Sequence, residues 1–137
     1  MKAIADTGFI VAFATRNDSH HGWAVDLARR HTEPFLTCEA VLAEAAFQIG
    51  SSAYVMSLVN DQLLKVEFSV ADNMDRITAL AERYQERSPD LADLCIIRMS
   101  ELFPSYTVLT VDEEDFRIYR RNRREVIPIL CPGQARG

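Results

Sequence analysis

Apolar and polar residues alternate along the chain with two periods, one typical of strands and one typical of helices. Short apolar runs that predict buried strands lie at residues 2–5, 35–37, 64–68, 107–110 and 125–130. The segment at residues 7–14 is predicted to be a buried helix or turn. Helical spacing of apolar residues predicts helices at residues 20–31, 39–49, 52–59, 73–87, 91–102 and 112–119. Strands that alternate with helices, without an Asn-Gly or Asp-Gly hairpin, indicate an α/β fold whose central parallel sheet is flanked by helices on both sides.

The length of 137 residues favours one folded domain, which we expect over residues 1–131 with a short C-terminal tail at 132–137. The apolar stretch at residues 8–14 is too short for a membrane span, and Asp6 interrupts any signal-peptide core. We therefore expect a cytoplasmic protein with no membrane contact. Cys38, Cys95 and Cys131 form no CxxC pair, so we expect core residues and neither a disulfide framework nor a zinc site.

The formal net charge of −5 is divided unevenly along the chain. Residues 1–116 hold 9 basic and 19 acidic side chains, whereas residues 117–137 hold 6 basic and 1 acidic. The basic cluster near the C-terminus consists of Arg117, Arg120, Arg121, Arg123 and Arg124. Such a cluster is suited to a nucleic-acid backbone, and a solvated helix face or a partner-docking surface is an equally good interpretation.

Several carboxylates lie where an acid is a poor structural choice. Ligands of open parallel sheets bind beyond the carboxyl ends of the strands. Asp6 follows the first predicted strand, and Asp112 follows the strand at 107–110. Asp90 and Asp93 share one face at the start of a helix, and Glu44 lies among small residues on a largely apolar helix. Each acid also has a simpler interpretation, as a helix cap, a turn residue or an exposed side chain.

If these acids converge, their mutual repulsion requires neutralisation by protons or cations. Oxygen ligands without His or Cys favour Mg²⁺ over zinc, with Mn²⁺ as the other candidate. A site of this kind can cleave a phosphate ester with metal-activated water. The arginine cluster would then attract the rest of a nucleic-acid strand.

Four segments of the chain together resemble one known family. They read IADT at residues 4–7, EAVLAE at 39–44, SPDLADL at 88–94 and LTVDEEDF at 109–116. In this order and spacing they resemble the PIN-domain family and, more narrowly, the VapC-type toxin ribonucleases of type II toxin–antitoxin systems. The resemblance implies a parallel sheet flanked by helices and a Mg²⁺-dependent endoribonuclease that hydrolyses single-stranded or looped RNA, leaving a 5′-phosphate and a 3′-hydroxyl.

The same resemblance assigns roles to individual residues. It implies an acidic catalytic constellation of Asp6, Glu44, Asp93 and Asp112, with Asp6 and Asp93 as the most direct metal ligands. It also implies supporting roles for Thr7, Asp90, Thr110 and Asp115, the two threonines through their hydroxyl groups. The partners it implies are an RNA substrate, a cognate antitoxin and a second copy of the chain in a homodimer.

Other classes of protein fit the sequence less well. A signalling receiver domain needs paired acids after its first strand and a lysine after a late strand, whereas Asp6 stands alone and the only lysines are Lys2 and Lys65. The five glycines are not clustered as a P-loop requires, and GxSxG and HExxH are absent from the sequence. An inactive PIN-like domain that binds RNA or a partner, and a housekeeping RNA-processing nuclease, remain as alternatives.

Overall fold

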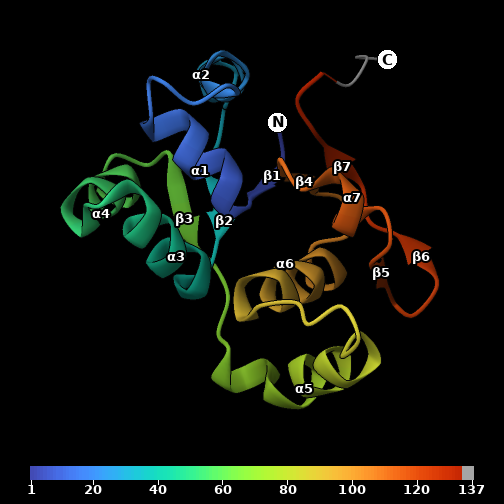
Figure 1. The fold of residues 1–137 in the computed structure, drawn as a ribbon. Coiled ribbons are helices and arrows are strands. Elements are labelled where there is room, and N and C mark those ends of the chain that lie inside the picture. Colours follow the sequence, from blue (N-terminus) through green and yellow to red (C-terminus); the bar gives the residue numbers. More distant parts are fainter. Residues whose placement is uncertain (134–137) are drawn as a thin grey trace.

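A five-stranded parallel sheet in the order β3-β2-β1-β4-β7 forms the centre of the protein (Figure 1). The structure, a computed structural model, describes residues 1–133, so most of the predicted tail at 132–137 lies outside the described residues. The strands of this sheet are β1 (Ala3–Ala5), β2 (Phe35–Thr37), β3 (Leu64–Val66), β4 (Thr107–Leu109) and β7 (Ile129–Leu130). The predicted parallel α/β fold is confirmed.

The helices largely follow the predicted ranges. They are α1 (Thr7–Ala14), α2 (His21–Arg29), α3 (Glu39–Ile49), α4 (Ser52–Asn60), α5 (Met74–Arg83), α6 (Leu91–Leu102) and α7 (Glu113–Phe116), with a 3-10 turn, η1 (Ala71–Asn73), before α5. The main difference is α5, which was expected to reach residue 87 and ends at Arg83. Beyond it the chain turns, and Ser88 takes a positive φ of 47° before Pro89 leads into α6. Within residues 1–133, no helix combines the length and apolar character needed to cross a bilayer.

The strand order reverses its direction at β1. From β1 the chain moves outward through β2 to β3, and then returns to add β4 on the opposite side of β1. Because crossovers between parallel strands are right-handed, this reversal puts α1–α4 on one face of the sheet and α5–α7 on the other. Figure 1 shows α3 and α4 in one group and α5 and α6 in another. The crevice between the ends of β1 and β4 is therefore the point where open parallel sheets bind ligands.

The core is built mainly from short apolar strands and from α6. Residues Ala3, Ile4 and Ala5 of β1 are fully buried, as expected for a central parallel strand covered on both faces. Phe9 of α1 packs edge-to-face on Phe35 of β2, with ring centroids 5.4 Å apart. Cys38, Cys95 and Cys131 are buried, in agreement with the prediction of core residues.

The predicted strand at 125–130 was wrong in part. It is divided into β6 (Glu125–Val126), which pairs antiparallel with β5 (Arg120–Arg121), and β7, which joins the main sheet. Asn122 and Arg123 make the turn of this β5–β6 hairpin, with positive φ angles of 48° and 72°. Glycine is the usual residue for such angles, and its absence from the turn explains why the sequence did not indicate a hairpin.

Arg121 in this hairpin is buried, with 7% of its surface exposed. Its Nη1 donates to the carbonyl oxygen and Oγ of Ser100 and to the Pro104 carbonyl oxygen, each at 3.1 Å. Its Nε donates to Oε2 of Glu125 at 2.9 Å. The guanidinium therefore fixes the hairpin to the C-terminal end of α6, and its burial leaves Arg121 unsuited to the RNA contact predicted for it.

Replacing Arg121 with alanine is expected to lower the free energy of unfolding by about 3 kcal/mol, because it leaves buried acceptors unpaired. Urea unfolding measures this change. Arg124 lies next to the same hairpin turn and is exposed, so Arg124→Ala is the matched control and should change stability by less than about 0.5 kcal/mol. Equal unfolding midpoints for the two variants would contradict the structural role of Arg121.

Candidate metal centre

An acidic cavity of about 210 Å³ lies at the crevice between the ends of β1 and β4. Six of its lining residues have acidic or amide side chains, and they come from α3, from the start of α6 and from the segments that follow β1 and β4. The full lining is Asp6, Thr7, Gly8, Glu44, Gln48, Asp90, Asp93, Val111 and Asp112. The structure thus brings together all four acids that the sequence singled out as a constellation, together with Asp90 and Thr7.

Asp6 is held rigidly at the end of β1. Its Oδ1 accepts from the backbone N–H of Thr7 at 2.8 Å, and its Oδ2 accepts from the Thr110 hydroxyl at 2.7 Å. The Thr110 oxygen in turn accepts from the backbone N–H of Asp112 at 3.0 Å. Thr110 follows β4, so its hydroxyl joins the first and last acidic segments of the site across neighbouring strands.

Two other acids are positioned as helix caps. Asp90 caps α6, with its Oδ1 accepting from the backbone N–H of Asp93 at 2.8 Å. Asp112 caps α7, with its Oδ1 accepting from the backbone N–H of Asp115 at 3.3 Å. The capping interpretation and the site interpretation are compatible, because a cap uses one carboxylate oxygen and leaves the second available.

The crowding of these acids raises their proton affinity. Burial, together with the negative charges of Asp6, Asp90, Asp112 and Glu44, raises the pKa of Asp93 to about 8. Burial raises the pKa of Asp6 to about 6, despite its two hydrogen bonds. These carboxyl groups therefore keep their protons to a higher pH than freely solvated aspartic acids do.

Glu44 extends the site from α3. Burial and the neighbouring Asp90 raise the pKa of Glu44. Its Oε1 accepts from the side-chain amide of Gln48, one helical turn later, at 3.3 Å. The spacing of four residues places Gln48 on the same face of α3 as Glu44, and this was the sequence signal that could have identified Gln48 as a lining residue.

A compact trio of carboxylates lies at one side of the cavity. Asp93, Asp112 and Asp115 each offer an oxygen, and these three oxygens lie within 4.8 Å of one another. Arg87 Nη2 donates to Oδ1 of Asp115 at 2.7 Å, so this acid already has a cationic partner. Sequence reasoning missed Arg87, since no local pattern links it to an acid 28 positions away.

The donor set fits a hard divalent cation. The lining consists of carboxylate, hydroxyl and amide groups, with no His or Cys among its residues. The Thr7 hydroxyl is buried at the cavity and has no hydrogen-bond partner within residues 1–133. A buried polar atom without a partner is unfavourable unless a ligand or water completes it. The trio of oxygens adds a place where carboxylates can share one ion.

All five arginines predicted to contact RNA lie outside this cavity, and the four other than the buried Arg121 differ in their surroundings. Arg117 pairs with Glu113 at 2.7 Å on the exposed surface. Arg120 donates through Nη1 to the carbonyl oxygen of Arg117 at 2.6 Å, near the end of α7. Arg123 and Arg124 are exposed at the hairpin turn. The arginines of the cluster are therefore close together in the sequence but make different contacts in the structure.

Comparison with known proteins supports the fold of the chain. No protein-family model matches the sequence, and no match was found among curated proteins. Among solved structures, the crystal structure of Mycobacterium tuberculosis VapC20, a toxin that cleaves the sarcin–ricin loop, matches with a TM-score of 0.68 and 18% sequence identity. The match covers 78% of this chain and 87% of that chain. The PIN-like fold expected from the sequence is confirmed.

Proposed function

We propose that the protein is a Mg²⁺-dependent endoribonuclease and acts as the toxin of a type II toxin–antitoxin pair in the cytoplasm. The observation that carries the proposal is the convergence of Asp6, Glu44, Asp93 and Asp112 on one cavity at the switch point of the sheet. The structural likeness to VapC20, a toxin that cleaves RNA at the sarcin–ricin loop, supports the same assignment. The likeness also favours RNA as the substrate and an antitoxin as a partner. The resemblance of the sequence adds a second copy of the chain as a proposed partner.

Asp93, Asp112 and Asp6 would hold the metal, with Mn²⁺ as the alternative to Mg²⁺. When bound, the metal would activate water and neutralise charge on the scissile phosphate. Thr110 keeps Asp6 in place, and the unpartnered Thr7 hydroxyl is suited to a donor contact with a phosphate oxygen. Arg87 partly neutralises Asp115, the member of the trio that would act as a supporting residue.

The proposal predicts that the purified protein cleaves structured RNA in the presence of Mg²⁺ or Mn²⁺ and stops when EDTA is added. A sarcin–ricin loop transcript and an unrelated hairpin of equal length serve as substrates, followed by gel electrophoresis of end-labelled RNA. We expect products with a 5′-phosphate. Cleavage that persists in EDTA would contradict metal-dependent hydrolysis, and RNA binding without cleavage under all metal conditions would favour the inactive binding domain.

Toxin activity and housekeeping RNA processing give different results in cells. Controlled expression of a toxin arrests growth, and co-expression of its antitoxin restores it. We expect growth arrest with the wild-type chain and normal growth with Asp93→Asn at equal protein levels. Growth that is unaffected by active enzyme would favour the housekeeping nuclease.

A further inference from the structure

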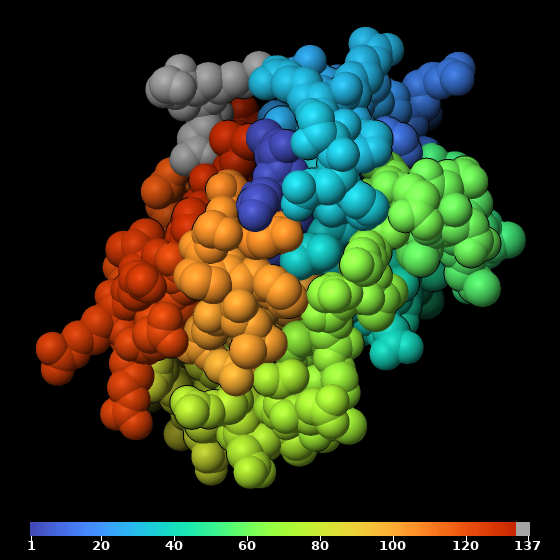
Figure 2. Space-filling model, turned by 180° about the vertical axis from the view of Figure 1, so that it is seen from behind, coloured from blue at the N-terminus to red at the C-terminus, as the bar shows by residue number. Residues whose placement is uncertain are grey.

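A second cavity, of about 250 Å³, lies between α5, the end of α6 and the β5–β6 hairpin. Three arginines line it, Arg76 and Arg83 from α5 and Arg123 from the hairpin turn. Arg76, Ala79, Leu80 and Arg83 follow the spacing of one helix face. Figures 1 and 2 both show α5 and the hairpin at the same end of the molecule. We call these three residues the arginine triad.

The triad carries positive charge without a local partner. Within residues 1–133, the side chains of Arg76, Arg83 and Arg123 make no ion pair and no hydrogen bond. All three are exposed. Three guanidinium groups that share one cavity repel one another, and an anion that enters the cavity removes this repulsion.

The single carboxylate of the cavity is already used elsewhere. Glu101 Oε1 accepts from Arg98 Nη1 at 3.0 Å, and its Oε2 accepts from the backbone N–H of Asn122 at 2.7 Å. Glu101 therefore anchors the hairpin turn and leaves the triad without neutralisation. The anchored turn also fixes the backbone of Arg123, the residue next to Asn122.

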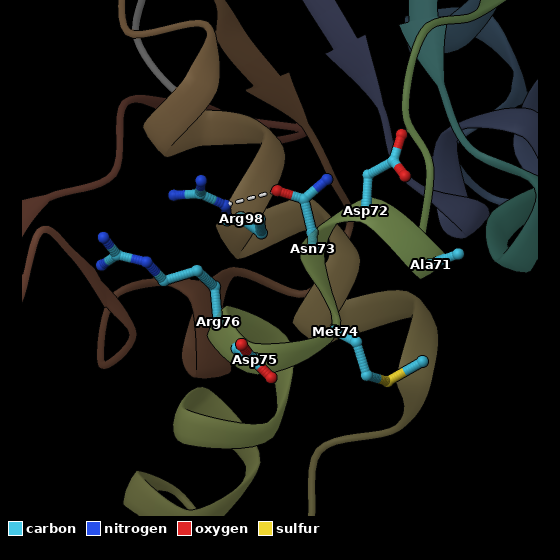
Figure 3. Close-up of a pocket in the computed structure, with 7 residues that line it drawn as sticks. All are labelled: Ala71, Asp72, Asn73, Met74, Asp75, Arg76 and Arg98. Atoms are coloured by element: carbon cyan, nitrogen blue, oxygen red, sulfur yellow. Dashed lines mark hydrogen bonds between the residues drawn. The ribbon is translucent and has the colours of Figure 1, made fainter.

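Arg76 also borders a neighbouring hollow, which is drawn in Figure 3. The side chains of Arg76 and Arg98 point to the same side there, whereas the carboxylate of Asp72 points away from them (Figure 3). Arg98 donates to Oδ1 of Asn73 at 2.9 Å and is paired with Glu101. Since that hollow also contains Asp72 and Asp75, the arginine triad is the better anion site of the two.

The backbone at Arg123 provides a way to test its side chain. Its φ of 72° is a conformation that glycine adopts readily and arginine does not. The hairpin turn requires this angle, as it requires the φ of 48° at Asn122. Arg123→Gly would therefore relax the turn while it removes one guanidinium from the cavity.

We propose that the arginine triad binds backbone phosphates of the RNA, at a distance from the acidic cavity. The inference rests on the proposed function for the identity of the anion. Asp93 and Glu101 lie eight residues apart on α6, about 12 Å at about 1.5 Å per residue. At about 3.4 Å per nucleotide in a stacked strand, the RNA between the two sites spans about three or four nucleotides. Substrates must then extend by this length beyond the cleavage site.

The test measures RNA affinity without cleavage. Binding of a fluorescein-labelled 20-nucleotide RNA is followed by anisotropy in EDTA over a range of salt concentrations. Arg76→Ala/Arg83→Ala should raise Kd at least tenfold and reduce the slope of log K against log salt by about 1.4, the value for two phosphates of a single strand. Arg123→Gly should raise Kd about threefold with an unchanged or higher Tm.

The matched control is Arg16→Ala/Arg29→Ala, which removes two exposed arginines, one just after α1 and one at the end of α2, and changes net charge equally. We expect its Kd within twofold of the wild type. Equal loss of affinity in both double variants would overturn the triad in favour of general charge attraction. Unchanged affinity in Arg76→Ala/Arg83→Ala would also overturn it.

Parallel cleavage assays separate this inference from the proposed function. With Mg²⁺, Arg76→Ala/Arg83→Ala should raise KM and leave kcat unchanged, because the triad lies outside the acidic cavity. A wild-type protein that binds RNA through the triad but never cleaves it would overturn the nuclease activity and leave the triad standing. A wild-type protein that cleaves RNA with no contribution from the triad would overturn the phosphate-binding role of the triad and leave the nuclease activity in place.

Discussion

Replacing Asp93 with asparagine is expected to abolish RNA cleavage and to raise the free energy of unfolding at pH 8 by about 1 kcal/mol. Cleavage is lost because Asp93, like Asp112, belongs both to the trio and to the cavity. Stability rises because the asparagine is neutral at a site where burial, together with the charges of Asp6, Asp90, Asp112 and Glu44, raises the pKa of Asp93 to about 8. Active sites often retain such unfavourable groups for the sake of function.

The pH dependence of this effect has a definite sign. The folded-state pKa of Asp93 lies above the ordinary aspartate value of 3.8, so the unfolded chain releases this proton first as pH rises. The wild-type protein therefore loses stability between about pH 4 and pH 8, and this loss is complete above pH 8. Urea unfolding at pH 5 and pH 8 should show a smaller loss in Asp93→Asn than in the wild type.

Asp75→Asn is the matched control for this variant. Asp75 lies in the first turn of α5, as Asp93 does in the first turn of α6, so both replacements remove the same favourable interaction with a helix N-terminus. Asp75→Asn should therefore lower stability slightly and leave cleavage unchanged. A strong loss of stability in Asp93→Asn would show that Asp93 is a structural residue.

The acids of the site could be predicted from the sequence because local patterns specify their positions. Asp6 and Asp112 follow apolar strands, and in a parallel sheet the ends of neighbouring strands meet at one edge. The Ser-Pro-Asp segment at 88–90 marks the start of α6 and so places Asp90 and Asp93 on one face. These signals lie within a few residues of the groups they position.

Contacts between distant segments were beyond this kind of reasoning. Arg121 appeared to be one of five similar arginines, and only the packing of the hairpin on α6 shows that its guanidinium is buried. In the sequence, Arg76 and Arg83 are polar positions of an amphipathic helix and carry no further signal. Their relation to Arg123 depends on a hairpin turn whose sequence, Asn-Arg, lacks the usual glycine. The roles of these residues could not be predicted because their contact partners lie far away in the sequence.

Added Mg²⁺ is expected to stabilise the protein strongly at pH 8 and only slightly at pH 5. A ligand that binds only the folded state at one hundred times its Kd adds about 2.7 kcal/mol, which is about 10 °C in Tm for a chain of this length. A pH of 5 lies below the pKa of Asp6, about 6, and that of Asp93, about 8. Protons on these carboxylates therefore compete with the cation.

Differential scanning fluorimetry at both pH values measures this effect, with NaCl at matched ionic strength as the control for screening. Asp93→Asn should lose most of the Mg²⁺ effect at pH 8, whereas Asp75→Asn should keep it. The same increase in Tm at both pH values, or in both variants, would mean that Mg²⁺ binds elsewhere. Because the measurement needs no substrate, it tests the acidic cavity as a metal site whether or not the RNA target is known.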